Sequence, residues 1–155
     1  MSIEYYEDMD LHQKRRSREY LLTSEDIIDF AKKWDPQPFH IDPELAKKSR
    51  FGGLVASSSH LNAISAKLEN ERRPKRAWVT VLSSDKTKFI NPARPGDILI
   101  LENEVLSKRE SNSNPDVGIV HFAVRLLNQR NEPVLTYEMT TIVGKRSLSS
   151  QFSED

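Results

Sequence analysis

The sequence changes its pattern after residue 76, and this change is the strongest constraint on the fold. Before it lie helix signals; after it come stretches rich in β-branched and aromatic residues, at 77–84, 86–90, 97–110, 117–129 and 133–145. Turn sequences such as NPARPGD and SNSNPD separate them, and residues 134–141 alternate with the period of a half-buried strand. Helices followed by long antiparallel strands predict an α+β fold in which the apolar face of the sheet is covered.

Helices are predicted in three places before residue 72. The first spans residues 24–34, with Thr23 or Ser24 as N-cap, and Pro36 forbids its continuation. A second, short helix covers residues 42–49 and begins with Asp42 and Pro43. The third is expected from residue 54 to 71 and is rich in small residues, so we expect it to cover the sheet and to be buried with other backbone close to it.

The composition places limits on the partners of the chain. Its 155 residues fit one domain, expected at 1–145, with a loose tail at 146–155. Lys+Arg and Asp+Glu both number 23, so no overall field attracts nucleic acid or an anionic membrane. The basic segment at 12–19 is interpreted as a loop or edge strand. The absence of cysteine excludes disulfides and thiolate sites, and the absence of a signal or spanning segment leads us to expect a cytoplasmic protein.

The first candidate site is the segment WDPQPFHID, residues 34–42. It holds Asp35 and His40 five positions apart, on backbone that we expect to be irregular and that two prolines stiffen. A carboxylate and an imidazole brought together can hold one water, with the carboxylate taking its proton and the imidazole donating a hydrogen bond or returning a proton. The alternative is structural: Asp35 caps the backbone of Gln37, and His40 is half buried.

The second candidate site is the segment ASSSH, residues 56–60, near the start of the long helix. The free N–H groups and the dipole of a helix N-terminus suit a carbonyl oxygen that acquires negative charge. Alternatively, the hydroxyls of the serines fold back onto the backbone and allow tight packing. His60 is expected to be a packed residue, and a metal held by Asp35, His40 and His60 is not expected because no third well-placed ligand can be identified.

Together the two segments resemble the MaoC-like dehydratases, the (R)-specific enoyl-CoA hydratases. The residues that carry the resemblance follow the family order and spacing: Asp35, Gln37-Pro38, His40, Asp42-Pro43, Phe51-Gly52 and Ala56-Ser57. Weaker resemblance extends to YEDMD near the N-terminus and to NPARPGD between strands. One departure stands out, because Ser58 occupies the position where the family has glycine.

The resemblance implies a hotdog fold, in which a long antiparallel sheet wraps the helix. It also implies a homodimer with acyl-CoA in a tunnel at the subunit interface, and no metal or organic cofactor. Asp35 and His40 would be catalytic and would activate the water that adds to a trans-2-enoyl thioester, or that leaves in the reverse dehydration. Phe39, Gly53, Ser57 and Ser58 would bind the substrate, with N–H groups around Ser57 and Ser58 holding the thioester oxygen.

Two other functions remain open from the sequence. Ser58 favours a hotdog dimer that binds an acyl thioester or another small ligand without catalysis, because an added side chain changes the approach to the backbone. A hotdog thioesterase acting on the same substrates is the second alternative.

Overall fold

The computed structural model describes residues 2–152. Its sheet has five antiparallel strands in the order β1-β3-β4-β5-β2. The strands are β1 (Lys14–Leu21), β2 (Trp78–Phe89), β3 (Ile98–Glu110), β4 (Val117–Leu127) and β5 (Pro133–Gly144). The helices are α1 (Ser24–Trp34), α2 (Pro38–Ile41), α3 (Pro43–Lys47) and α4 (Ser58–Glu71), with 3-10 turns η1 (Tyr6–Asp8) and η2 (Arg146–Gln151).

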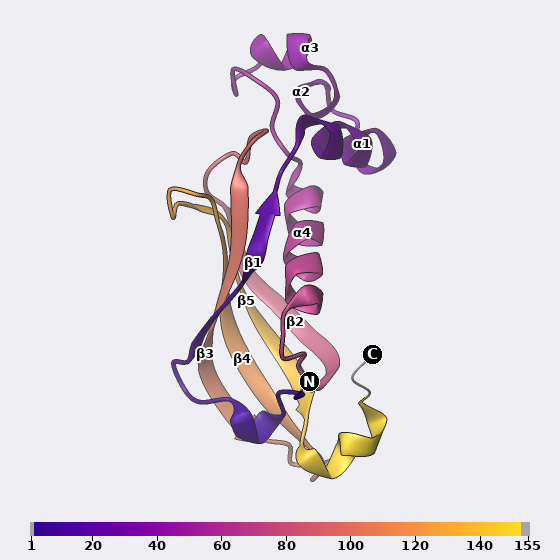
Figure 1. Ribbon diagram of the computed structural model, residues 1–155, viewed down its shortest axis with the longest axis vertical. Coiled ribbons are helices and arrows are strands. Elements are labelled where there is room, and N and C mark those ends of the chain that lie inside the picture. The colour runs from indigo at the N-terminus through magenta and orange to yellow at the C-terminus, as the bar shows by residue number, and fades with distance from the viewer. Residues whose placement is uncertain (1, 153–155) are drawn as a thin grey trace.

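The sheet curves along α4, and α1, α2 and α3 form a cap beyond the N-terminal end of that helix (Figure 1). The α+β arrangement predicted from the sequence is therefore confirmed. None of the helices within residues 2–152 is both long and apolar enough to cross a membrane. In the segment expected to be a loose tail, η2 forms and Phe152 packs against the core; residues 153–155 lie outside the described part.

Helix α4 packs one face on the sheet. Leu61, Ile64 and Leu68 are 3%, 2% and 0% exposed, as their helical spacing predicts, and they join a core that includes Phe122 of β4. The expectation that this helix is surrounded was wrong for the single chain, because Ala63 and Ala66 on the opposite face are exposed. The sheet covers one side of α4 only, which leaves the other side open.

Three boundaries differ from the sequence prediction. Helix α4 begins at Ser58, four residues later than expected, because Ser57 takes the extended N-cap conformation and accepts a hydrogen bond from the His60 N–H. Residues 38–41, expected to be irregular, form a single helical turn that starts at Pro38. The two stretches at 77–84 and 86–90 belong to one strand, β2, in which Lys86 adopts a positive φ of 53° and the pairing with β5 is shifted.

The basic segment forms the edge strand β1, where its arginines meet acidic side chains. Arg15 lies 3.1 Å from Glu4, and Arg16 lies 2.8 Å from Glu102. Their charges are therefore already paired within the chain.

A buried ionic cluster ties the N-terminal segment to α4 and the sheet. Arg76 donates to Glu4 at 2.9 Å, to Glu69 at 2.7 Å and to the side-chain oxygen of Asn103 at 2.8 Å. Arg72 also donates to Glu4, at 3.0 Å. Because the charges are paired and hydrogen-bonded, they can remain ionised away from water.

Candidate functional site

Asp35 lies where α1 ends. Its N–H donates to the carbonyl of Ala31, and Pro36 then prevents another helical turn. The N–H of Gln37 donates to the main-chain carbonyl of Asp35, at 2.8 Å, and not to the carboxylate. The contact with Gln37 that the structural alternative assigned to Asp35 is thus made by the main chain of Asp35. Its carboxylate faces His40 instead.

His40 lies in α2 and is 7% exposed. Its Nδ1 is 2.6 Å from the carbonyl oxygen of Val55, and its Nε2 is 3.7 Å from Oδ2 of Asp35. A carbonyl oxygen can only accept, so Nδ1 carries a proton, and in the neutral ring Nε2 has the free lone pair. The rings of Phe39 and His40 form a T-shaped contact with their centroids 4.5 Å apart. This contact helps to fix the orientation of the imidazole.

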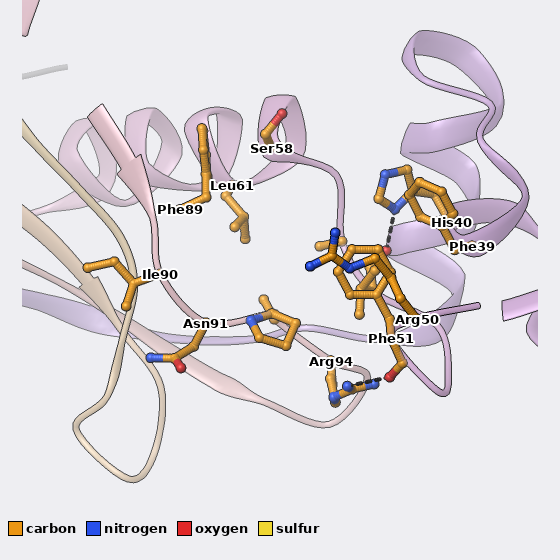
Figure 2. A pocket seen from close by; sticks show the side chains of 14 residues that line it. Phe39, His40, Arg50, Phe51, Ser58, Leu61, Phe89, Ile90, Asn91 and Arg94 are labelled. Atoms are coloured by element: carbon orange, nitrogen blue, oxygen red, sulfur yellow. Dashed lines mark hydrogen bonds between the residues drawn. The ribbon is translucent and has the colours of Figure 1, made fainter. Parts of the chain in front are cut away.

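A cavity of about 590 Å³ opens beside His40 (Figure 2). Its wall includes Phe39 and His40 from α2, Ser58 and Leu61 from α4, and Ile90 just after β2. Asp35 does not line the cavity and is connected to it through His40. The cavity therefore joins the imidazole to the N-terminus of α4.

The start of α4 offers hydrogen-bond donors at the cavity wall. The hydroxyl of Ser57 accepts a hydrogen bond from the His60 N–H at 3.2 Å. The N–H groups of Ser58 and Ser59 lie in the first turn of α4, where main-chain N–H groups have no acceptor within the helix. Ser58 lines the cavity, and Figure 2 shows its hydroxyl directed away from Arg50. The side chain of Ser58 is therefore part of the cavity wall and does not point toward Arg50.

The predicted site residues do not all meet. Phe39, His40 and Ser58 line the cavity, with Asp35 behind His40, whereas Ser57 is 1% exposed and acts as a cap. Gly53 lies outside the lining residues, and a Cβ there would be 3.4 Å from Nη1 of Arg94. A Cβ at that distance would make an ordinary van der Waals contact, so the packing of Arg94 does not require glycine here.

Sequence reasoning missed three groups at this site. The carbonyl of Val55 anchors His40, but a backbone acceptor has no signature in the sequence. Arg50 and Arg94 also line the cavity. Arg94 lies in the NPARPGD segment, which was interpreted as a turn that weakly resembles the family, without a role for its arginine.

His60 is a packed residue, as expected. Its ring stacks on Phe30 of α1, with centroids 4.4 Å apart and planes 8° from parallel, and its buried Nδ1 has no hydrogen-bond partner. Burial lowers the pKa of His60 below its ordinary value of 6.5, although Asp26 acts in the opposite direction. The neutral ring joins the helix that ends at Asp35 to the helix that starts beside the cavity.

We expect this burial to make folding sensitive to acid. The unfolded chain protonates His60 as the pH falls through 6.5, whereas the folded chain does so only at lower pH. The contribution of the neutral His60 to the free energy of unfolding is therefore complete above pH 6.5 and is lost as the pH falls below it. Between about pH 7.5 and 5.5, the free energy of unfolding in urea should fall less in His60→Phe than in the natural protein. Equal losses in the two proteins would contradict this role.

Comparison with known proteins agrees with the geometry. The MaoC like domain model matches residues 9–124. The uncharacterized protein YdeM of Bacillus subtilis is 29% identical over 140 residues, covering 90% of this chain and 98% of YdeM. Mesaconyl-CoA hydratase of Cereibacter sphaeroides is 38% identical over 63 residues, or 41% of this chain and 18% of that protein.

Solved structures show the same architecture. The MaoC-like dehydratase from Rhodospirillum rubrum has a TM-score of 0.86 and 35% identity, over 92% of this chain and 98% of its own. For the R-hydratase PhaJ1 of Pseudomonas aeruginosa the TM-score is 0.75 with 25% identity, over 91% and 85%. Rv0216 of Mycobacterium tuberculosis, a double hotdog fold, has a TM-score of 0.76 at 14% identity, over 92% and 44%. The chain has a single hotdog domain and belongs to the MaoC-like domain family.

Proposed function

We propose that the protein catalyses the (R)-specific hydration of trans-2-enoyl-CoA, or the reverse dehydration. The observation that carries this proposal is the placement of Asp35 and His40, 3.7 Å apart, beside a cavity that also reaches the N-terminus of α4. The names of an R-hydratase and a mesaconyl-CoA hydratase among the similar proteins support the reaction class.

The spacing of the two side chains suits a bridging water. At 3.7 Å the two atoms are too far apart for a direct hydrogen bond, but one water can reach both. Since Nδ1 of His40 is engaged with Val55, Nε2 and the carboxylate of Asp35 both accept. The water then donates one hydrogen to each of them and presents its lone pair to the substrate.

The reaction follows from this arrangement. The water oxygen bonds to the third acyl carbon as a proton passes to the Asp35–His40 pair, and the electrons of the double bond move toward the thioester oxygen. The N–H groups of the first turn of α4 stabilise this enolate, and the second acyl carbon then takes a proton from the pair. Atoms and charges balance without a cofactor or a metal.

We infer a homodimer from the exposed edge of the sheet. Strand β2 has a neighbour on one side only, and Val79, Val81 and Leu82 are 49%, 54% and 53% exposed. A long edge strand with exposed apolar side chains in its first half favours pairing with a second chain. Such pairing would place the partner beside Phe89 and Ile90, which line the cavity, so that the cavity would become a tunnel at the interface.

Val81→Asp combined with Leu82→Asp should convert this dimer into a monomer. In the dimer interface the two new carboxylates would be buried without partners, which opposes association. In the single chain both positions are exposed, so the variant should still fold. Sedimentation equilibrium measures the change, with Leu11→Asp, at a 56% exposed position outside β2, as the control. An unchanged mass for the double variant would exclude this edge as the interface.

The direct test of the function is the loss of the conjugated absorbance of crotonyl-CoA, followed by chiral separation of the product. Rapid loss that yields the (R)-3-hydroxyacyl thioester supports the proposal. No loss with crotonyl-CoA or with longer and branched enoyl thioesters would refute it.

A further inference from the structure

Two arginines lie on the wall of the cavity that holds His40. Arg50 precedes Phe51, and Arg94 comes from the turn between β2 and β3. None of the described residues that line this cavity is acidic. Although the whole chain has no net charge, the cavity therefore has a positive local charge.

The two guanidinium groups are held in different ways. Nη2 of Arg94 donates to the carbonyl of Phe51 at 2.6 Å, and this hydrogen bond fixes one side of its guanidinium group. The Arg50 guanidinium is exposed and lies 5.7 Å from the ring centroid of Phe51. Figure 2 shows it extended over the middle of the cavity, while Arg94 lies along one edge.

Arg50 and Arg94 have no carboxylate partner, whereas most other arginines in residues 2–152 have one. Arg15, Arg16 and Arg76 each pair with a glutamate. Within residues 2–152, neither Arg50 nor Arg94 forms an ion pair through its side chain. Several N–H donors of each fork remain available to a ligand, and planar forks of this kind match phosphate and carboxylate oxygens.

We propose that Arg50 and Arg94 bind an anionic oxygen group of the thioester substrate. This inference rests on the proposed function, since it concerns the substrate of that same cavity. Two parts of the substrate can supply the group: a phosphate of the CoA carrier, or a carboxylate on the acyl chain. In both cases the arginines act in binding and specificity, and Asp35 and His40 perform the addition of water.

Calorimetric titration with three probes separates the two sources. Pantetheine has no anionic group. CoA carries the phosphates, and the only anionic group of succinyl-pantetheine is the carboxylate at the end of its acyl chain. Arg50→Ala should weaken binding of the recognised anionic probe about 10- to 100-fold and leave pantetheine binding unchanged. Loss with CoA identifies the phosphate, and loss with succinyl-pantetheine identifies the carboxylate. Arg50→Lys should retain part of the affinity, because it keeps the charge but not the fork.

Arg109→Ala is the matched control, because it removes the same charge from an exposed position on β3 that does not line this cavity. The inference is overturned if Arg50→Ala binds all three probes as the natural protein does, if it weakens pantetheine equally, or if the natural protein binds none of them. Arg94→Ala also breaks the hydrogen bond to Phe51, so Arg50→Ala is the decisive variant. Crotonyl-CoA hydration is measured separately: its absence alongside the expected binding pattern refutes only the proposed function.

Discussion

Asp35→Asn is expected to lower kcat/KM for the hydration of crotonyl-CoA by about 10²- to 10⁴-fold, the range lost when a general base is removed. The amide is nearly isosteric with the carboxylate but cannot take a proton from the water that we propose to lie between Asp35 and His40, whose side chains are 3.7 Å apart. The fold should persist, because the main-chain bonds of Asp35 to Ala31 and Gln37 do not involve its side chain.

Asp29→Asn provides the control for this variant. It makes the same change at an exposed position on the same helix, α1, and should retain full activity. Initial rates and circular dichroism of both variants separate loss of chemistry from loss of fold. If Asp35→Asn kept more than about a tenth of the activity of the natural protein, Asp35 would not be the base.

Arg76→Met is expected to lower the free energy of unfolding by about 3–5 kcal/mol, the cost of leaving buried charges without their partner. Arg76 is 6% exposed and bonds to Glu4, Glu69 and Asn103. Its guanidinium also lies 4.6 Å from the ring centroid of Phe122. Methionine preserves much of this packing but provides no charge.

The deficit in Arg76→Met should depend on pH. Burial raises the pKa of Glu69, and Arg76 opposes this, so removing Arg76 raises the pKa further above that of the unfolded chain. A raised carboxyl pKa favours the folded state at low pH and loses that effect as the pH rises, so the deficit should be smaller near pH 5 than near pH 8. Urea unfolding at the two pH values measures this difference.

Arg130→Met is the control, because Arg130 pairs with Glu132 at the surface, where both side chains are largely exposed. Its cost should stay within about 0.5 kcal/mol. A similar small cost for Arg76→Met would show that the cluster does not stabilise the fold.

The sequence was most informative where local chemistry decides structure. The apolar spacing of Leu61, Ile64 and Leu68 predicted the buried face of α4, and Thr23 with Pro36 predicted where α1 begins and ends. It was less informative where tertiary packing decides. The start of α4 was placed too early, because residues 54–57 have helix-compatible side chains but form no helix. Instead, Val55 forms hydrogen bonds with Phe39 and His40 of α2.

The candidate site shows the same division. Asp35 and His40 were found because their residue types and spacing suggest chemistry, and the structure brings them within 3.7 Å. The anchoring carbonyl of Val55 and the guanidinium groups of Arg50 and Arg94 come from separate segments that only the fold brings to one cavity. No local sequence pattern indicates that these three groups lie at the site.

The most direct test of the central claim, that Asp35 and His40 direct a water to the third acyl carbon, is turnover of crotonyl-CoA in water labelled with heavy oxygen. Mass spectrometry then locates the label. We predict one labelled oxygen in the 3-hydroxyl group of an intact thioester. Label in a free carboxylate, with release of the thiol, would indicate a thioesterase, and unlabelled, unchanged crotonyl-CoA would indicate a binding protein; either result would contradict the proposed hydration.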